Sequence, residues 1–245
     1  MKNMITHNGA PPKRGAAIEE TFQKIRNMLY SSLLAPGQKI IYTDLARRLN
    51  VSVTPVIQAL NRLKASGFVT YAPNKGYFVS EITEQEALQL YEAREALEIY
   101  IIPRIVENLN PRVVSQFKKT FKKHSMESEN LIGRRLILVD AHFHLKIAEF
   151  AANEVIYTML EEIFEKLYLK YRPEYFSNEQ ILGIVQEHRA LLDALSRGEA
   201  QEAIAATRRH IASGRARVIN SLRIRQAPDI LLGGVREVTL GKVGM

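Results

Sequence analysis

The sequence predicts a mainly α-helical protein with an N-terminal winged helix-turn-helix and a C-terminal all-helical bundle of about six helices. Apolar residues recur at helical spacing along most of the 245 residues. Two short helical segments joined by a tight turn precede a glycine-bounded hairpin. Residues 1–80 contain eleven Lys or Arg and three Asp or Glu, whereas residues 81–245 contain twenty-three of each kind. The net charge of +8 therefore belongs to the first third, as expected of a module that binds a polyanion.

Composition narrows the class of protein. The length favours two domains of unequal size, and we divide the chain into a flexible basic arm (1–16), a small basic domain (17–81), a larger all-helical domain (82–225) and a tail (226–245). The chain has no cysteine, which excludes disulfides and thiolate zinc sites. It has no apolar run as long as a membrane span and no hydrophobic signal region at its start. We therefore expect a cytoplasmic protein without a membrane partner.

The basic domain is expected to begin with a helix. Apolar residues recur every three or four positions from 17 to 32, and a Pro-Gly pair then ends the pattern. Thr43 is placed to cap a short helix over 44–49. On this helix the apolar residues face inward, and Arg47 and Arg48 face outward.

A second short helix follows a tight turn. Ser52 or Thr54 can cap it, and Pro55 suits its first turn, where the missing N–H costs nothing. One face of this helix is an apolar stripe. The other presents Val53, Thr54, Ile57, Gln58, Asn61 and Lys64. Two short helices so joined, the second with its first turns facing outward, form a helix-turn-helix.

A hairpin completes the domain. Alternating segments over 68–71 and 77–80 flank a turn with a basic tip, and Lys75 at this tip can reach a backbone phosphate. A merely solvated basic surface is the alternative reading of the charge. The candidate DNA contacts are the exposed residues Thr43, Arg47, Arg48, Ser52, Thr54, Gln58, Asn61, Arg62, Lys64, Lys75 and Gly76.

The second domain is predicted to be helical throughout. A capping box, Thr83-Glu-Gln-Glu86, opens a helix that runs to about Pro103. The helical patterns that follow lie at about 111–128, 132–152, 155–171, 179–196 and 199–222.

Four residues of the kinds that bind metals are predicted to face inward from three of these helices. Asp140 and His144 are four residues apart, so they share one helix face, which is otherwise apolar. His188 and, less strongly, His210 also fall on apolar faces. Burying a carboxylate without a partner is costly, so the set predicts a shared cation; a hydrogen-bonded Asp–His pair is the alternative. Three imidazoles and one carboxylate suit Zn²⁺, Ni²⁺, Mn²⁺, Fe²⁺ or Co²⁺ better than Mg²⁺ or Ca²⁺.

A small carboxylate is the predicted ligand of this ion. Four protein ligands leave two positions open on an octahedral ion and none on a tetrahedral one. In the octahedral case Arg94, Arg134 and Arg135 are candidates for a second contact with the carboxylate. Ordinary surface salt bridges are the alternative role of these arginines.

A metal-dependent hydrolase or lyase with a basic tethering domain is the alternative function, because such a metal site can activate water. Against it, Glu187 is the acidic neighbour of His188 and is expected to point away from the ligands. His142 is expected on the solvent face, and His7 and His124 lack an apolar-face context.

These motifs resemble the GntR family of bacterial transcription regulators. Residues 51–56 and 74–79 look like its winged-helix module. The Asp140 to His144 pair, His188 and His210 look like the metal-binding positions of the all-helical ligand-sensing (FCD) domain in its FadR-type branch. The likeness runs from about residue 18 to residue 225.

The resemblance implies a homodimeric regulator, which we expect to be a repressor. Its first domain would bind a palindromic double-stranded DNA operator with two half-sites and be nucleoid-associated when bound. Its second domain would sense a small organic acid and form the dimer. A variant of the branch that binds a long acyl thioester without metal is disfavoured by the retained ligands.

One departure from the family concerns base readout. The family usually carries arginines at the positions of Val53 and Ile57 and an acidic residue at that of Gln58. Apolar side chains cannot form the bidentate hydrogen bonds by which arginine reads guanine. Direct readout would then come from Thr54, Gln58 and Asn61, and we expect a half-site rich in A·T pairs.

Overall fold

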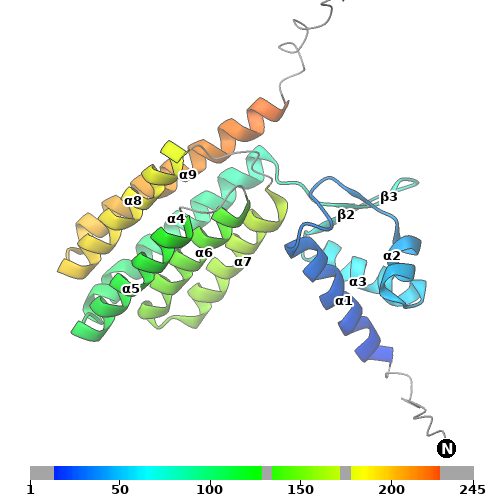
Figure 1. Ribbon diagram of the computed structural model, residues 1–245, viewed down its shortest axis with the longest axis horizontal. Coiled ribbons are helices and arrows are strands. Elements are labelled where there is room, and N and C mark those ends of the chain that lie inside the picture. The colour runs from blue at the N-terminus through cyan, green and yellow to red at the C-terminus, as the bar shows by residue number, and fades with distance from the viewer. Residues whose placement is uncertain (1–13, 129–133, 172–177, 227–245) are drawn as a thin grey trace, which may run out of the picture. The chain divides into compact units, whose positions relative to one another are not determined.

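The computed structural model describes residues 14–128, 134–171 and 178–226 (Figure 1). These residues form nine α-helices, one short 3-10 helix and a three-stranded sheet, which confirms the mainly α-helical class. The tail beyond residue 226 and most of the basic arm lie outside the described residues. The end of the arm, from Arg14, already belongs to the first helix. None of the described helices is long and apolar enough to cross a membrane.

The described residues fall into two compact units. One lies within Met1–Ile82 and Glu127–Arg172, and the other within Thr83–Met126 and Pro173–Met245. The first unit therefore combines the N-terminal domain with a helical hairpin that comes much later in the chain.

The N-terminal part of the first unit is a winged helix, which we call the head. Its helices α1 and α2 pack on the central helix α3, and its two main strands form the predicted hairpin. Strand β1 was not predicted, because two residues are too short to show an alternating pattern. It pairs with β3, so that the sheet order is β1-β3-β2. The elements are α1 (Arg14–Tyr30), β1 (Lys39–Ile40), α2 (Tyr42–Leu49), α3 (Val53–Ala65), β2 (Val69–Ala72) and β3 (Gly76–Val79).

The apolar stripe predicted for the second helix of the helix-turn-helix, which is α3 and which we call the recognition helix, forms the centre of the head core. Its members are fully buried: Val56, Ala59, Leu60 and Leu63. The helix-turn-helix turn itself depends on Asn50, which adopts a left-handed conformation at the end of α2 with φ of 53°. Asparagine is one of the few non-glycine residues that tolerate this region.

Of the two capping predictions for the head, the one for Thr43 was wrong, and the one for Ser52 was right in position but not in its hydrogen bond. Helix α2 begins at Tyr42 with Ile41 at its N-cap, so Thr43 lies inside the first turn. Ser52 occupies the N-cap position of α3, but its side chain makes no capping hydrogen bond, and Thr54 lies within the helix. These polar side chains therefore remain on the surface of the turn.

The second part of the first unit is a helical hairpin made of α6 (Arg134–Ala148), the 3-10 turn η1 (Glu149–Ala151) and α7 (Glu154–Lys170). The Asn153 side chain caps α7 by accepting a hydrogen bond from the amide of Ile156 at 3.1 Å. The last turn of α7 packs on the head, because Tyr168 and Leu169 join the head core.

Polar contacts reinforce this junction. Glu165 of α7 accepts a hydrogen bond from Arg26 Nε at 3.0 Å and one from the Tyr30 hydroxyl at 2.7 Å. The Tyr168 hydroxyl donates to the carbonyl of Tyr30 at 3.0 Å, and the amide of Ile82 donates to the carbonyl of Lys170 at 3.1 Å. Burial and the Glu165 carboxylate raise the pKa of Tyr30, which therefore stays a neutral donor. Sequence patterns did not reveal this junction.

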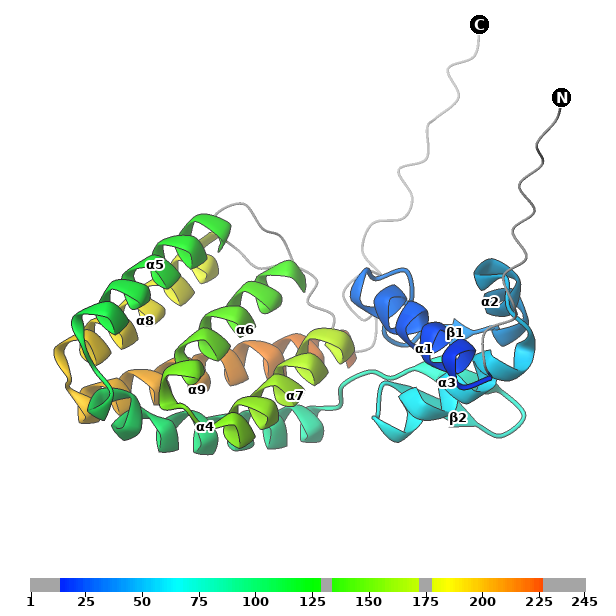
Figure 2. The same ribbon diagram turned by 90° about the horizontal axis from the view of Figure 1, so that it is seen from below.

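The second unit consists of α4 (Glu84–Glu107), α5 (Pro111–Ser128), α8 (Asn178–Arg197) and α9 (Ala200–Gln226). Helix α9 lies along both α4 and α8 (Figure 2). Thr83 caps α4 as predicted, by accepting a hydrogen bond from the amide of Glu86 at 3.1 Å. The helix does not end at Pro103 but passes through it for another turn.

Candidate functional site

One pair of candidate metal ligands lies on α6. His144 is almost fully buried, and its Nε2 lies 3.8 Å from Oδ1 of Asp140, which is partly exposed. The His144 ring stacks against Phe164 of α7 and meets the edge of Phe143. These aromatic neighbours hold the imidazole in one orientation. The four-residue spacing places both donors on one side of the helix, as predicted.

A second pair lies on α8 and α9. His188 and His210 are both fully buried, and their Nε2 atoms are 3.2 Å apart. The other ring nitrogen of each histidine is also occupied. His188 Nδ1 lies 2.8 Å from Nε2 of His124, and His210 Nδ1 lies 2.9 Å from Oε2 of Glu187. Histidines that ligate metals almost always have their second nitrogen engaged in this way.

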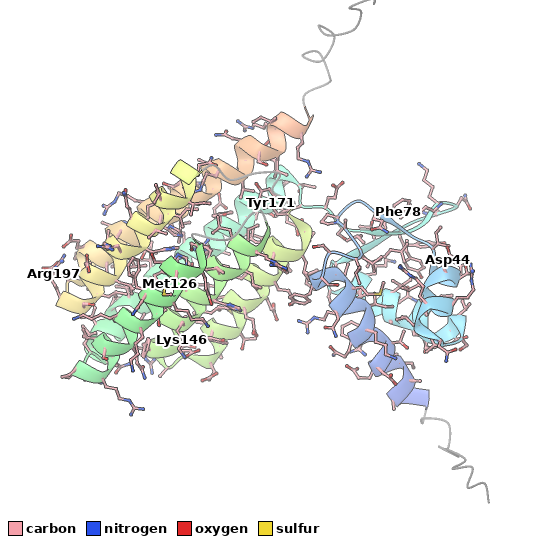
Figure 3. All side chains as sticks on the ribbon, viewed as in Figure 1. Asp44, Phe78, Met126, Lys146, Tyr171 and Arg197 are labelled. Atoms are coloured by element: carbon pink, nitrogen blue, oxygen red, sulfur yellow. The ribbon has the colours of Figure 1, made fainter. Side chains whose placement is uncertain are left out.

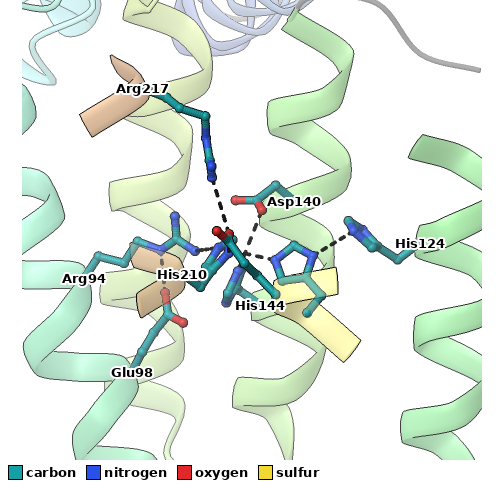
Figure 4. A network of polar contacts seen from close by, with 9 residues as sticks. Arg94, Glu98, His124, Asp140, His144, His210 and Arg217 are labelled. Carbon is teal, nitrogen blue, oxygen red and sulfur yellow. Dashed lines mark hydrogen bonds and ion pairs between the residues drawn. The ribbon is translucent and has the colours of Figure 1, made fainter. Parts of the chain in front are cut away.

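The four predicted ligands are brought together (Figure 4). Asp140, His144, His188 and His210 each offer one ligand atom, and these atoms all lie within 4.8 Å of one another. Around one ion with bonds of about 2.0–2.1 Å, ligand atoms lie roughly 3–4 Å apart. The Nε2 pair at 3.2 Å and the carboxylate–imidazole pair at 3.8 Å fit that range. Three nitrogens and one oxygen favour a transition metal over Mg²⁺ or Ca²⁺.

Of the three arginines proposed as effector contacts, one lies at the cluster. Arg94 is buried, its Nε donates to Glu98 Oε1 at 2.5 Å, and its Nη2 lies 3.3 Å from His210 Nε2 (Figure 4). Arg135 is exposed on the first turn of α6, and the side chain of Arg134 lies outside the described residues. Of the three arginines, only Arg94 is therefore seen to place its guanidinium beside a candidate ligand.

Sequence analysis missed two residues of this site. His124 was given no context, yet it is buried and bonded to His188. Its helical spacing from Phe117 and Phe121 could have revealed the buried face. Glu187 was expected to point away from the ligands, and this was wrong. It is the neighbour of His188 in sequence, but its carboxylate reaches His210 and lies 3.6 Å from Arg217. Tertiary packing of α8 on α9 decided its partner.

His142 is exposed on α6, as predicted. His7 lies outside the described residues.

The outward face of the recognition helix is partly exposed and partly in contact with the rest of the head. Val53, Thr54, Asn61 and Lys64 are exposed, whereas Ile57 and Gln58 are half-buried. The Tyr77 hydroxyl donates to Asn61 Oδ1 at 3.0 Å. Burial raises the pKa of Tyr77, so this phenol remains a donor. The wing therefore holds the Asn61 amide in place.

The candidate basic contacts differ in their surroundings. Arg48 and Lys75 are exposed, the latter at the wing tip beside Gly76. Arg47 pairs with Asp44, which lies on α2 at the surface of the head (Figure 3). Arg62 pairs with Glu19 of α1 at 2.6 Å and lies over the ring of Phe22. Exposed ion pairs are worth little, so DNA phosphates can compete for Arg47, whereas Arg62 also packs on an aromatic ring.

The turn of the helix-turn-helix carries a shallow surface hollow. Thr43, Arg47 and Ser52 line it together with Asn50 and Val53. The structure thus gathers three of the predicted DNA-contact residues at one surface.

Two family models match the chain. Residues 17–79 match bacterial regulatory proteins of the gntR family, and residues 89–213 match the FCD domain. The Nta operon transcriptional regulator of Aminobacter aminovorans is 28% identical over 161 residues, which cover 64% of this chain and 76% of that protein. The HTH-type transcriptional regulator McbR of Escherichia coli is 25% identical over 173 residues, covering 70% and 78% of the two chains.

Solved structures share the fold. E. coli McbR/YncC gives a TM-score of 0.63 at 21% identity, covering 83% of this chain and 97% of that chain. A GntR transcriptional regulator from Rhodococcus sp. RHA1 gives a TM-score of 0.66 at 17% identity, covering 84% and 99%.

Proposed function

The chain belongs to the GntR family of bacterial regulatory proteins, in the branch that carries an FCD domain, and from this premise we propose that a divalent metal and a small carboxylate control its binding to DNA. It is a transcription regulator and not an enzyme, since its relatives are named transcriptional regulators. The hydrolase or lyase alternative has no support from these relatives. The one acidic candidate for a general base, Glu187, is hydrogen-bonded to His210.

One observation carries the proposal: three buried imidazole nitrogens and one carboxylate oxygen all lie within 4.8 Å of one another. Asp140, His144, His188 and His210 would hold the ion, whose positive charge supplies an anchor for an anionic ligand when it is bound. Buried imidazoles that face one another in a low-dielectric interior are also stabilised by such an ion.

Arg94 would provide the second contact for a carboxylate effector. Its guanidinium is buried beside His210, and a planar guanidinium suits the bidentate recognition of a carboxylate. Its partner Glu98 keeps the uncomplexed guanidinium from being an isolated buried charge. An organic acid small enough to reach both the ion and Arg94 is the class of effector that fits.

Binding at the helical domain would reach DNA through the hairpin of α6 and α7. This hairpin carries Asp140 and His144 on α6, and Glu165 and Tyr168 on its α7 contact α1 of the head. An effector changes DNA binding only by its differential affinity for two arrangements of the protein. We expect those arrangements to differ in the hairpin, and the effector to release a repressor from its operator.

The regulator would act as a homodimer on a palindromic operator in the bacterial cytoplasm, associated with the nucleoid when bound. A single short recognition helix buries too little surface for operator affinity, and a two-fold dimer matches two half-sites. Without arginines at Val53 and Ile57, an A·T-rich half-site remains the expectation.

Metal analysis of the purified protein, followed by DNA titrations with and without a chelator, tests the proposal. The DNA would be an operator selected from random duplexes. We expect about one transition-metal ion per chain and a change in operator affinity of at least about fivefold on chelation, the lower end of typical coupling between sites. If the purified protein contains no metal and its operator affinity does not change when Zn²⁺ is added, the proposal is contradicted.

Two substitutions in the head should separate phosphate contacts from base contacts. Lys75→Ala removes an exposed charge at the wing tip, so it should weaken binding to all duplexes alike and reduce the slope of log K against log salt by about one. Asn61→Ala removes a group on the recognition helix, so it should change sequence preference with little change in that slope. Salt titrations on the selected operator and on a scrambled duplex measure both effects. Equal behaviour of the two variants would refute the assignment.

A further inference from the structure

Tyr77 of β3 joins the wing to the recognition helix. The residue is 7% exposed, and its hydroxyl donates to Asn61 Oδ1 at 3.0 Å. Its ring centroid lies 5.0 Å from that of Tyr71 on β2 and 6.5 Å from that of Tyr42 on α2, which it meets edge to face. Both separations are those of interacting aromatic pairs. Contacts from three elements of the head therefore hold the ring and the hydroxyl of Tyr77 in place.

The direction of the bond to Asn61 follows from what else these two side chains contact. Among the residues that the structure describes, neither the Tyr77 hydroxyl nor the Asn61 amide has another hydrogen-bond partner. If the amide were turned the other way, its NH₂ group would donate to the phenol, and the phenol proton would have no acceptor in this part of the protein. Donation from the phenol to the amide carbonyl satisfies both groups.

This bond determines what Asn61 can offer to DNA. The residue is exposed, but its oxygen is turned towards a buried phenol, so the NH₂ group is what remains on the outer side. Bidentate recognition of adenine needs both amide atoms, the oxygen for N6 and the nitrogen for N7. An amide whose oxygen is held by Tyr77 cannot turn to align both atoms with that edge. Asn61 is therefore restricted to donating.

We propose that Tyr77 is a positioning residue that makes Asn61 a donor, so that Asn61 selects thymine or guanine at one position of the half-site. In the major groove, thymine O4 and guanine O6 accept hydrogen bonds, whereas adenine N6 and cytosine N4 donate them. A fixed NH₂ group bonds to the two carbonyl bases and disfavours the two amino bases. The inference rests on the proposed operator binding and adds the class of base that one residue reads.

Gln58 lies one turn earlier on the recognition helix and lacks this restraint. Its Oε1 is buried and has no hydrogen-bond partner among the described residues. A buried carbonyl without a partner is costly, so turning outward to a base breaks no bond and relieves that cost. Gln58 therefore keeps both amide atoms for adenine. The expected A·T-rich half-site then has adenine where Gln58 reads and a carbonyl base where Asn61 reads.

Selection of operators from random duplexes tests the proposal. Comparison with Asn61→Ala identifies the position that Asn61 reads, because the base preference is lost there. At that position the parent should prefer thymine or guanine over adenine and cytosine by about 2–10-fold, the range that one hydrogen bond supplies. Titrations of the selected operator carrying each of the four bases at that position then distinguish thymine from guanine.

Tyr77→Phe removes the hydroxyl and keeps the ring. The Asn61 amide is then free to turn, so adenine should be bound within about twofold of the carbonyl bases, because the hydrogen bond that set the preference is no longer directed. The preference at the position read by Gln58 should stay that of the parent. The salt dependence of binding should also be unchanged, since no charge is altered. A merely structural role of Tyr77 would not change the preference at one position alone.

Tyr71→Phe is the matched control. Tyr71 is the cross-strand partner of Tyr77, and its hydroxyl makes no hydrogen bond to Asn61. The variant loses the same atom from a neighbouring ring and should select the operator of the parent.

Asn61→Asp provides a second variant in case Tyr77→Phe does not fold. Tyr77 can donate to one carboxylate oxygen, and the other oxygen faces outward as an acceptor. The preference at this position should therefore reverse towards cytosine or adenine, whose amino groups donate. Retention of the parent's preference by this variant would overturn the proposal.

The outcomes separate this inference from operator binding itself. Parent protein that enriches no sequence refutes the proposed function. A selected operator that is the same for Asn61→Ala, or an amino base at the Asn61 position of the parent, overturns the inference and leaves operator binding intact. Tyr77→Phe that keeps the parent's preference likewise overturns only the role of Tyr77.

Discussion

Replacing His144 by glutamine is expected to weaken zinc binding by more than about 100-fold, because loss of an outer partner alone costs 10–100-fold and His144 is a candidate ligand of the ion itself. At a free zinc concentration about 1,000 times the parent Kd, the ion stabilises the fold by about 4 kcal/mol, and a 100-fold weaker site retains only about 1.4 kcal/mol. For a chain of this size the difference of about 2.7 kcal/mol corresponds to a Tm lower by roughly 5–10 °C. Thermal denaturation in zinc buffers measures it.

His142→Gln is the matched control for this prediction. It makes the same chemical change two residues away on α6, but on the exposed face, whereas His144 is buried. We expect the control to keep the zinc-dependent rise in Tm, and His144→Gln to show at most about one third of that rise. A His144→Gln variant that still shows the full zinc-dependent rise would exclude this residue as a ligand.

Replacing Glu165 by glutamine is expected to uncouple the head from the helical domain. Glu165 accepts from Arg26 and Tyr30 of α1, and neutral glutamine loses the charge that strengthens both hydrogen bonds. Since Arg26 is partly exposed, we expect a loss in the free energy of unfolding of only about 1–2 kcal/mol. The ratio of operator affinities with and without Zn²⁺ should fall to about one, while zinc affinity changes little.

Glu162→Gln is the control for that junction, because Glu162 lies on the same helix but is exposed. Operator titrations at fixed zinc and with chelator, together with urea unfolding, measure coupling and stability separately. If Glu165→Gln kept the parent ratio of affinities, the signal would not pass through this carboxylate. The packing of Tyr168 and Leu169 into the head core would then be the remaining link between hairpin and head.

Local patterns of the sequence were sufficient for much of the head. The stripe of Val56, Ala59, Leu60 and Leu63 is fully buried as predicted, because a 3.6-residue period leaves only one face for the core. The hairpin follows from alternating residues around a Gly-containing turn. Capping was less predictable, because Thr43 and Ser52 can equally hydrogen-bond to water once the turn is exposed.

The candidate metal ligands were also recognisable, since burying polar groups on apolar helix faces is costly and calls for a common partner. The residues that contact these ligands were not recognisable from the sequence. Glu187 shares a helix with His188 but bonds to His210, and His124, for which sequence analysis found no apolar-face context, bonds to His188.

The sequence by itself determined the apolar faces of the helices, the approximate position of each helix and the location of the positive charge in the head, because these depend on periodicity and composition along one segment. Only the tertiary structure decided which ring nitrogen faces which partner, that Tyr77 engages Asn61, and that α7 bonds to α1 through Glu165. Such contacts join side chains far apart in the chain, and their geometry depends on how helices pack, which no local pattern encodes.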